Sequence, residues 1–251
     1  MWLFAVCWMY KYHEPASHFD AGLVLEVFGV KETCALLFDL DGTLTDTLRD
    51  LCECVNEVLQ AHGLPPHPME AYRHFVGDGM RKLIQRALGD ACTPALLEEL
   101  VSEFLPLYDR ECLRYVSLYS GIAETVASLK AQGFRLAVVT NKPERQAQKI
   151  VAHLFPPDTF VVVHGNVPQR PTKPDRAVVD LTLQELDVPA ERAFFVGESV
   201  VDVLTAQNAG LLCIGCCLGF RGERELTEAG AAYLAHTASD IVAICESFCV
   251  V

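Results

Sequence analysis

The spacing of apolar side chains changes near residue 120, and this change divides the chain. Between residues 48 and 104 apolar side chains recur every three or four positions, which is typical of helices. Gly63 and Gly89 end two of these helices, and Thr93-Pro94 begins a third that we expect to stop at Pro106. Short apolar runs predict buried strands at 34–38, 136–140, 160–163, 193–196, 211–215 and, more weakly, 233–235.

Helical periods separate the later strands and lie at 122–129, 144–154, 175–186, 200–209 and 239–248, with Ser239 as the cap of the last helix. Strands that alternate with helices predict a parallel sheet with helices on both faces. We therefore expect an α/β protein with a Rossmann-like parallel-sheet core and an inserted all-helical cap domain. The core would comprise 34–45 and 119–251, the cap 46–118, and an N-terminal extension of unknown role 1–33.

Composition narrows the classes of function. A chain of 251 residues can bury a large core without disulfides, and its 51% hydrophobic and 21% charged residues are typical of globular proteins. The formal charge of −13 disfavours binding to duplex nucleic acid or to an acidic membrane surface. The 11 cysteines fit no disulfide framework and are typical of reduced thiols. We expect a cytoplasmic monomer or homodimer with no nucleic-acid or membrane partner.

The first strand ends at two carboxylates. Ligands of parallel sheets bind at the carboxyl ends of the strands, so these positions are the candidates for chemistry. Asp39 and Asp41 are two residues apart, and extended backbone would place both on the same side. Close carboxylates repel unless a cation lies between them, and Gly42 permits a tight turn there. The alternative is a solvated Asp-Gly turn.

Two further strand ends carry groups that suit a phosphate. Thr140 and Asn141 offer a hydroxyl and backbone N–H groups ahead of a helix, although either residue could simply cap that helix. Lys173 lies between two prolines and is either a phosphate ligand or a solvated loop lysine.

A fourth strand end adds two acids. Glu198 and Asp202 are four residues apart across a strand-to-helix turn. Together with Asp39 they would form a hard-oxygen site suited to Mg²⁺. In the alternative interpretation, Ser199 caps the helix and the two acids are incidental.

These four groups follow one another in a fixed order, and together they resemble a known pattern. Residues 38–44 (FDLDGTL), Thr140, Lys173 and the Gly197-Glu198…Asp202 segment resemble the four motifs of the haloacid dehalogenase-like superfamily of phosphohydrolases. The resemblance covers about residues 34–250. Within the superfamily, residues 75–83, 118–121 and 134–144 are most similar to the phosphoglycolate phosphatase group.

The resemblance implies catalytic roles for the strand-end residues. Asp39 would be the nucleophile that forms an aspartyl-phosphate, and Asp41 the general acid and base. Thr140 and Lys173 would complete the catalytic set. The metal ligands would be Asp39, the Asp41 carbonyl and an acid of the fourth motif, Glu198 or Asp202.

We also expect substrate contacts by Gly42, Thr43 and Asn141 and, from the cap, by Gly79 and Arg81. Arg81 or Lys82 would meet a carboxylate of the substrate, and the alternative is that both are solvated helix charges. One position departs from the superfamily pattern, because the fourth motif usually opens with Gly-Asp and here has Glu198.

The expected function is therefore a Mg²⁺-dependent phosphatase acting on a small phosphorylated metabolite, a phosphoglycolate-like phosphomonoester. The alternatives are a phosphosugar mutase or a pyrophosphatase of the same superfamily. A different class is a non-catalytic phosphate-binding regulator, which would have lost its metal through the change to Glu198.

Overall fold

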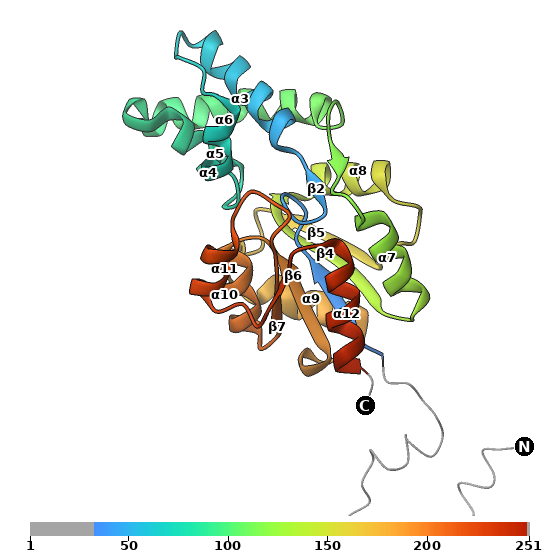
Figure 1. The fold of residues 1–251 in the computed structure, drawn as a ribbon. Coiled ribbons are helices and arrows are strands. Elements are labelled where there is room, and N and C mark those ends of the chain that lie inside the picture. The colour runs from blue at the N-terminus through green and yellow to red at the C-terminus, as the bar shows by residue number, and fades with distance from the viewer. Residues whose placement is uncertain (1–32, 250–251) are drawn as a thin grey trace, which may run out of the picture. The chain divides into compact units, whose positions relative to one another are not determined.

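The computed structural model describes residues 33–249 and contains a parallel sheet of six strands in the order β5-β4-β1-β6-β7-β8 (Figure 1). The expected α/β class is confirmed. The predicted extension at 1–33 falls outside the described residues except for Thr33. The strands are β1 (Ala35–Phe38), β4 (Arg135–Pro143), β5 (Val162–Asn166), β6 (Ala193–Gly197), β7 (Leu212–Cys216) and β8 (Tyr233–Ala235).

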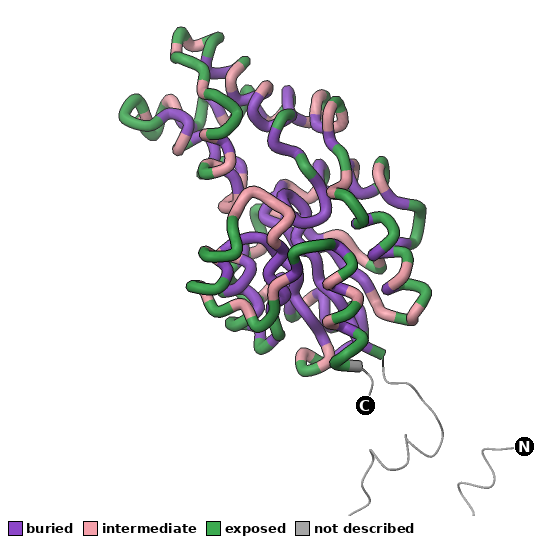
Figure 2. Tube along the Cα trace, viewed as in Figure 1, coloured by how far each residue is buried: buried purple, intermediate pink, exposed green. Residues whose placement is uncertain are grey.

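Alternate residues of β1 point into two separate cores, which explains why helices cover both faces of the sheet. Leu36 and Phe38 pack with residues of α7, α8 and α12, whereas Ala35 and Leu37 pack with residues of α9, α10 and α11. Figure 2 shows the resulting burial along the central strands. The helices are α7 (Ile122–Ala131), α8 (Glu144–Leu154), α9 (Ala177–Leu186), α10 (Val200–Ala209), α11 (Glu223–Ala229) and α12 (Ala238–Cys249).

A helical insert follows β1 and lies beyond the carboxyl ends of the strands (Figure 1). Two short strands, β2 (Thr45–Asp46) and β3 (Ser117–Leu118), pair in antiparallel fashion where the insert leaves and rejoins the sheet domain. The described residues 33–249 belong to one compact unit, so the division into core and cap stays a prediction. The helices of the insert are α3 (Leu48–Ala61), α4 (Met69–Phe75), α5 (Met80–Leu88) and α6 (Pro94–Glu111).

The predicted strand at 160–163 is displaced toward the C-terminus. Phe160 precedes β5, and its apolar ring packs against Phe155 and Phe38 instead of pairing in the sheet. The polar residues His164 and Asn166 nevertheless pair with β4. The prediction from apolar side chains therefore placed this strand too early in the sequence. Backbone hydrogen bonds form a strand whether its side chains are apolar or polar.

The sequence prediction missed one helix and misplaced the ends of two others. Helix α11 was not predicted, because Leu226 is its only buried residue and one residue produces no apolar period. Ser239 lies inside α12, and the Asp240 carboxylate instead accepts the backbone N–H groups of His236 and Thr237 at 2.8 Å each.

The expected end of a helix at Pro106 is also wrong, because α6 continues past this proline to Glu111. The turn after the proline buries Leu107 and Tyr108, and this burial offsets the hydrogen bond that proline cannot donate.

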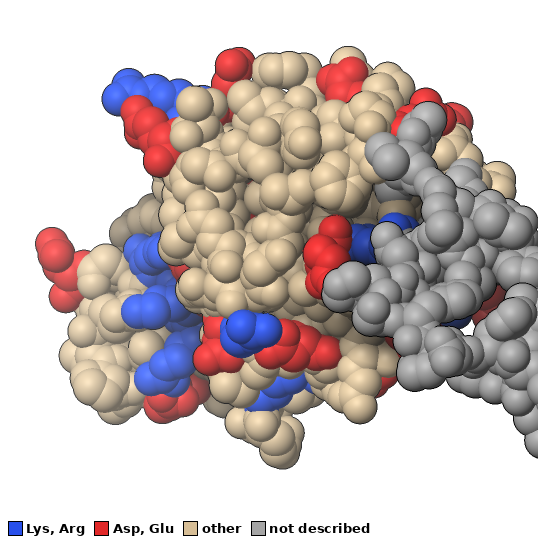
Figure 3. Space-filling view, turned by 90° about the horizontal axis from the view of Figure 1, so that it is seen from below, with Lys and Arg blue, Asp and Glu red and all other residues tan. Residues whose placement is uncertain are grey.

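Seen from below, most of the Lys and Arg side chains of the described surface gather along one side of the molecule (Figure 3). In Figure 3, Lys and Arg lie next to Asp and Glu around a broad area without charged side chains. Among the described residues, no helix is long and apolar enough to cross a membrane.

We expect Pro106→Ala to raise the free energy of unfolding by about 1–3 kcal/mol, because alanine restores the missing N–H inside an exposed turn of α6. Chemical unfolding followed by circular dichroism measures this difference. An unchanged or lower stability would show that α6 is distorted at this position in a way that favours proline.

Candidate active site

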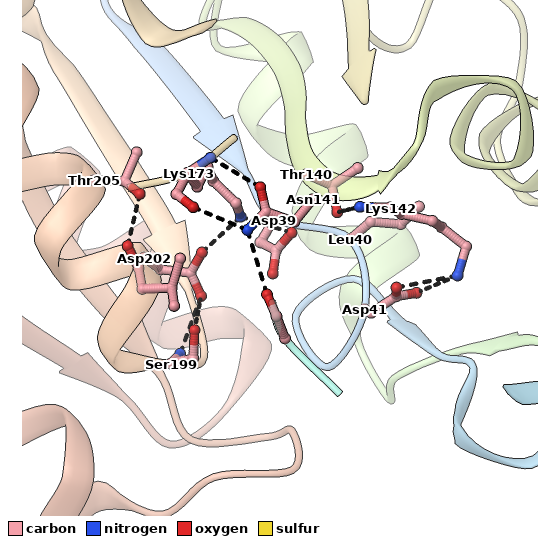
Figure 4. A network of polar contacts seen from close by, with 12 residues as sticks. Asp39, Leu40, Asp41, Thr140, Asn141, Lys142, Lys173, Ser199, Asp202 and Thr205 are labelled. Atoms are coloured by element: carbon pink, nitrogen blue, oxygen red, sulfur yellow. Dashed lines mark hydrogen bonds and ion pairs between the residues drawn. The ribbon is translucent and has the colours of Figure 1, made fainter. Parts of the chain in front are cut away.

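The four predicted groups meet at the carboxyl ends of β1, β4 and β6. The strand β1 lies between β4 and β6, where the order of the sheet reverses, and α/β sheets bind ligands at such a point. At the centre is the buried ammonium of Lys173, whose Nζ lies 2.9 Å from Asp39 Oδ1 and 2.7 Å from Asp202 Oδ1 (Figure 4). One cation thus joins carboxylates that follow two different strands.

The side chain of Asn141 holds the backbone of Lys173 in place. Its Oδ1 accepts the Lys173 N–H at 2.9 Å, and its Nδ2 donates to the Lys173 carbonyl at 3.1 Å. The side-chain amide is therefore occupied by the loop that carries the lysine. Only the backbone N–H of Asn141 can serve as a phosphate ligand.

Asp202 has no free oxygen on its side chain. While Oδ1 accepts the proton of Lys173, Oδ2 accepts the N–H groups of Glu198 at 3.1 Å and Ser199 at 3.0 Å, and the Ser199 hydroxyl at 2.8 Å. A Cβ on Gly197 would lie 2.2 Å from the Cβ of Asp202, so glycine is required for this close approach. Asp202 and Ser199 therefore cap α10, as in the alternative interpretation, and Asp202 also lies at the site next to Lys173.

The Asp41 carboxylate faces away from Asp39, contrary to the expectation that both point to the same side (Figure 4). The strand ends at Phe38, and the chain then turns around the Leu40 carbonyl, which accepts N–H groups from the next residues. Asp41 Oδ1 accepts the Thr47 hydroxyl at 2.7 Å, and Lys142 Nζ lies 2.9 and 3.0 Å from the two carboxylate oxygens.

Sequence reasoning missed Lys142. Its side chain is fully buried, and its ammonium lies 4.7 Å from the centre of the Tyr108 ring, which belongs to helix α6 of the insert. The available signal was a lysine directly after Asn141 at a strand end. The spacing of residues along the sequence does not indicate that Lys142 pairs with Asp41.

Glu198 reaches the site by lying across Gly42. A Cβ on Gly42, whose φ is +81°, would lie 2.8 Å from Glu198 Cγ. Glu198 Oε2 accepts the backbone N–H groups of Phe220 at 3.0 Å and Arg221 at 2.9 Å. Gly42, which has no side chain, thus leaves room for the additional methylene of Glu198. The backbone N–H groups of Phe220 and Arg221 bind its carboxylate.

The carboxylates outnumber the cations around Lys173. Burial raises the pKa of Asp39 to about 6, and the negative charge of Asp202 acts in the same direction while Lys173 opposes it. Burial also raises the pKa of Glu198 to about 8, with further contributions from Asp202 and Asp39. Burial and the neighbouring acids thus favour a proton on Glu198, and a bound divalent cation would take the place of that proton, so the oxygen donors of Asp39 and Glu198 fit Mg²⁺.

The remaining predicted residues divide between the cavity and the surface. Thr140 and Gly79 line a small cavity between insert and sheet that is partly open to solvent. Thr43 is fully buried, and its hydroxyl has no hydrogen-bond partner among residues 33–249. Arg81 does not line the cavity, because it is exposed and pairs with Glu98.

Comparison with known proteins gives concordant matches. The sequence pattern of haloacid dehalogenase-like hydrolases matches residues 36–216. A phosphoglycolate phosphatase of Pseudomonas putida is 34% identical over 198 residues, covering 76% of this chain and 72% of that protein. One from Colwellia psychrerythraea is 33% identical over 220 residues, covering 85% of this chain and 97% of that protein.

Solved structures share the fold. The crystal structure of a predicted phosphoglycolate phosphatase from Haemophilus somnus has a TM-score of 0.78 and 28% sequence identity, and the match covers 84% of this chain and 97% of that one.

The raised pKa of Glu198 gives a pH dependence of stability with a definite sign. Between the ordinary value of 4.5 and about 8, the folded protein holds a proton that the unfolded chain has released. The free energy of unfolding contributed by this group therefore falls as pH rises through that range. In chelator, we expect the wild type to lose at least about 1 kcal/mol more than Glu198→Gln between pH 5 and 8.

Chemical unfolding at several pH values measures this difference. Glu124→Gln, at an exposed position of α7, is the matched control and should follow the wild type. Parallel curves for the wild type and Glu198→Gln would contradict the assignment.

Proposed function

The chain belongs to the haloacid dehalogenase-like hydrolase family, and from this premise we propose that it is a Mg²⁺-dependent phosphatase of a small phosphomonoester resembling phosphoglycolate. The observation that carries the proposal is the buried Lys173 held between Asp39 and Asp202 at the carboxyl end of the sheet. The names of the relatives support a phosphoric monoester hydrolase, and in this proposal Asp39 is the nucleophile and Asp41 the acid.

In the first step, a carboxylate oxygen of Asp39 attacks phosphorus and forms an aspartyl-phosphate. The bond between phosphorus and the ester oxygen breaks, its electron pair stays on that oxygen, and Asp41 donates a proton to it. The product alcohol then leaves.

In the second step, Asp41 takes a proton from a water molecule that attacks the same phosphorus. The bond between phosphorus and the Asp39 oxygen breaks, and inorganic phosphate and the free carboxylate are regenerated. Asp41 can serve both steps because the first leaves it deprotonated and the second restores its proton.

The phosphoryl oxygens would be held by the Lys173 ammonium, the Thr140 hydroxyl and the Asn141 backbone N–H. These groups are fixed before the substrate arrives, because Lys173 is bound by two carboxylates and its backbone by the Asn141 amide. Fixed donors stabilise developing charge without first having to reorganise.

The metal would be held by Asp39, the backbone carbonyl of Asp41 and Glu198. When bound, Mg²⁺ supplies charge neutralisation for the nucleophile and the phosphoryl oxygens. Asp202 would not bind the metal directly, because its oxygens already accept hydrogen bonds from Lys173 and from the turn that carries Glu198. The ligand set expected from the sequence is retained in this proposal with Asp202 in an indirect role.

Asp39→Asn should reduce phosphate release to the background rate, because a carboxamide is not an effective nucleophile. The measurement is phosphate release from p-nitrophenyl phosphate and phosphoglycolate with Mg²⁺. Asp180→Asn, at an exposed position of α9, is the matched control. Undiminished turnover by a folded Asp39→Asn variant would contradict the mechanism.

Glu198→Ala should raise the Mg²⁺ concentration needed for half-maximal activity by about 10–100-fold, the range typical of lost support at metal sites. Glu198→Asp tests the departure from the usual motif and should retain more activity than alanine. The measurement is a Mg²⁺ titration of phosphatase activity. An unchanged Mg²⁺ requirement in Glu198→Ala would exclude Glu198 from the metal site.

A further inference from the structure

The cavity beneath the insert receives side chains from both parts of the protein, and its composition is one-sided. The insert contributes apolar and glycine residues, and the sheet contributes the polar ones. The lining comprises Leu51, Val76, Gly77, Gly79, Met80 and Leu83 from the insert, and Asp39, Asp41, Thr140, Asn141 and Lys142 from the sheet domain. Lys142 is the one cationic side chain in this lining.

We propose that Lys142 binds a carboxylate on the leaving group of the substrate. This proposal rests on the proposed phosphatase function and names its substrate class, phosphomonoesters of short hydroxy acids. It assigns the recognition of the second negative charge to a residue of the sheet domain, where the sequence had suggested Arg81 of the insert.

Asp41 holds the Lys142 ammonium close to the position that the leaving group of the substrate would occupy. Asp41 donates its proton to the ester oxygen, so the leaving group begins next to Asp41. Lys142 Nζ lies within 2.9–3.0 Å of both Asp41 oxygens, and the Tyr108 ring lies against the ammonium at the boundary with the insert. A negative group one or two carbon atoms beyond the ester oxygen would therefore reach this ammonium.

The two lysines of the site divide the substrate between them. In Figure 4, Lys173 lies with Asp39 and Asp202, and Lys142 lies with Asp41 on the opposite side. The phosphoryl group belongs to the first cluster because Asp39 is the nucleophile. The Lys142 ammonium, which is paired with Asp41, is then the cation in the cavity lining that the other end of a small substrate with two anionic groups can reach.

Other cations near the insert are directed elsewhere. Arg81 pairs with Glu98, Arg86 pairs with Asp78, and Arg221 Nη2 donates to the Val76 carbonyl at 3.2 Å. None of the three lines the cavity. A buried carboxylate without a partner is costly, so a substrate with a carboxylate needs Lys142 in this cavity.

The apolar wall limits the size of the leaving group. Leu51, Val76, Met80 and Leu83 offer no hydrogen-bonding side chain to a polyhydroxylated alcohol such as a sugar. A sugar hydroxyl buried against them would lose its hydrogen bonds to water. A short hydroxy acid has few other polar groups to satisfy once its carboxylate is bound by Lys142.

The experiment compares two substrates that differ mainly in charge, 2-phosphoglycolate and its carboxamide, with the full chain and Mg²⁺. We expect the wild type to prefer the carboxylate by at least about tenfold in kcat/KM, because a hydrogen bond to a charged group is typically worth that factor or more. Lys142→Met should lower kcat/KM for the carboxylate by about 10–100-fold, mostly through KM. It should lower the value for the carboxamide by a factor about tenfold smaller, because that loss reflects only the missing partner of Asp41, so that the preference disappears.

Lys130→Met makes the same substitution at an exposed lysine of α7 and should keep the wild-type preference. Lys142→Gln keeps a hydrogen-bond donor for Asp41 without the charge and replaces the methionine variant if that variant does not fold. It too should lose the preference.

Three results would overturn the proposal. An equal loss on both substrates would show that Lys142 serves only to hold Asp41. A preference that disappears in Arg81→Met would assign the carboxylate to that residue instead. A wild type that releases phosphate from other monoesters with no preference for the carboxylate would remove the substrate class but leave the phosphatase intact. Only a wild type with no activity on any monoester, including p-nitrophenyl phosphate, would contradict the proposed function itself.

Discussion

The ion pairs of the buried Lys173 join the parts of the site that the sequence keeps far apart. Its ammonium lies between Asp39, which follows β1, and Asp202, which lies in the first turn of α10. Removing one member of a buried ion pair typically costs about 3–5 kcal/mol, because the other charge is left without a partner. The position of Asp39, the proposed nucleophile, therefore depends on Asp202, a buried acid that does not contact the substrate in our proposal.

Glycines, which have no side chain, allow the loops around the site to pack against each other. A Cβ on Gly219 would lie 1.9 Å from the Gly42 carbonyl oxygen, and a Cβ on Gly42 would lie 2.8 Å from Glu198 Cγ. The loop after β7 therefore packs directly on the turn after β1. This contact brings the N–H groups of Phe220 and Arg221 to Glu198. The unusual glutamate is supported by a third segment that the four motifs do not include.

The sequence predicted the elements of the sheet domain well, because buried strands and amphipathic helices leave strong local patterns. Helices 144–154 and 200–209 have the predicted bounds. The directions of individual side chains were harder to predict. Asp41 turns away from Asp39 because the chain leaves extended geometry at Leu40. Arg81 pairs with Glu98, and the helical spacing of apolar residues could not identify this partner. Lys142 depends on residues 41 and 108, which only the fold brings together.

The central claim is that Asp39 becomes covalently phosphorylated, and the Asp41→Asn variant offers the most direct measurement. With p-nitrophenyl phosphate the leaving group needs little protonation, so the first step proceeds, whereas the second lacks its base and the intermediate accumulates. Quenched protein is treated with borohydride, which reduces an aspartyl-phosphate to homoserine, and peptides are read by mass spectrometry. The account predicts homoserine at position 39. Release of p-nitrophenol by this variant without any conversion at position 39 would contradict it.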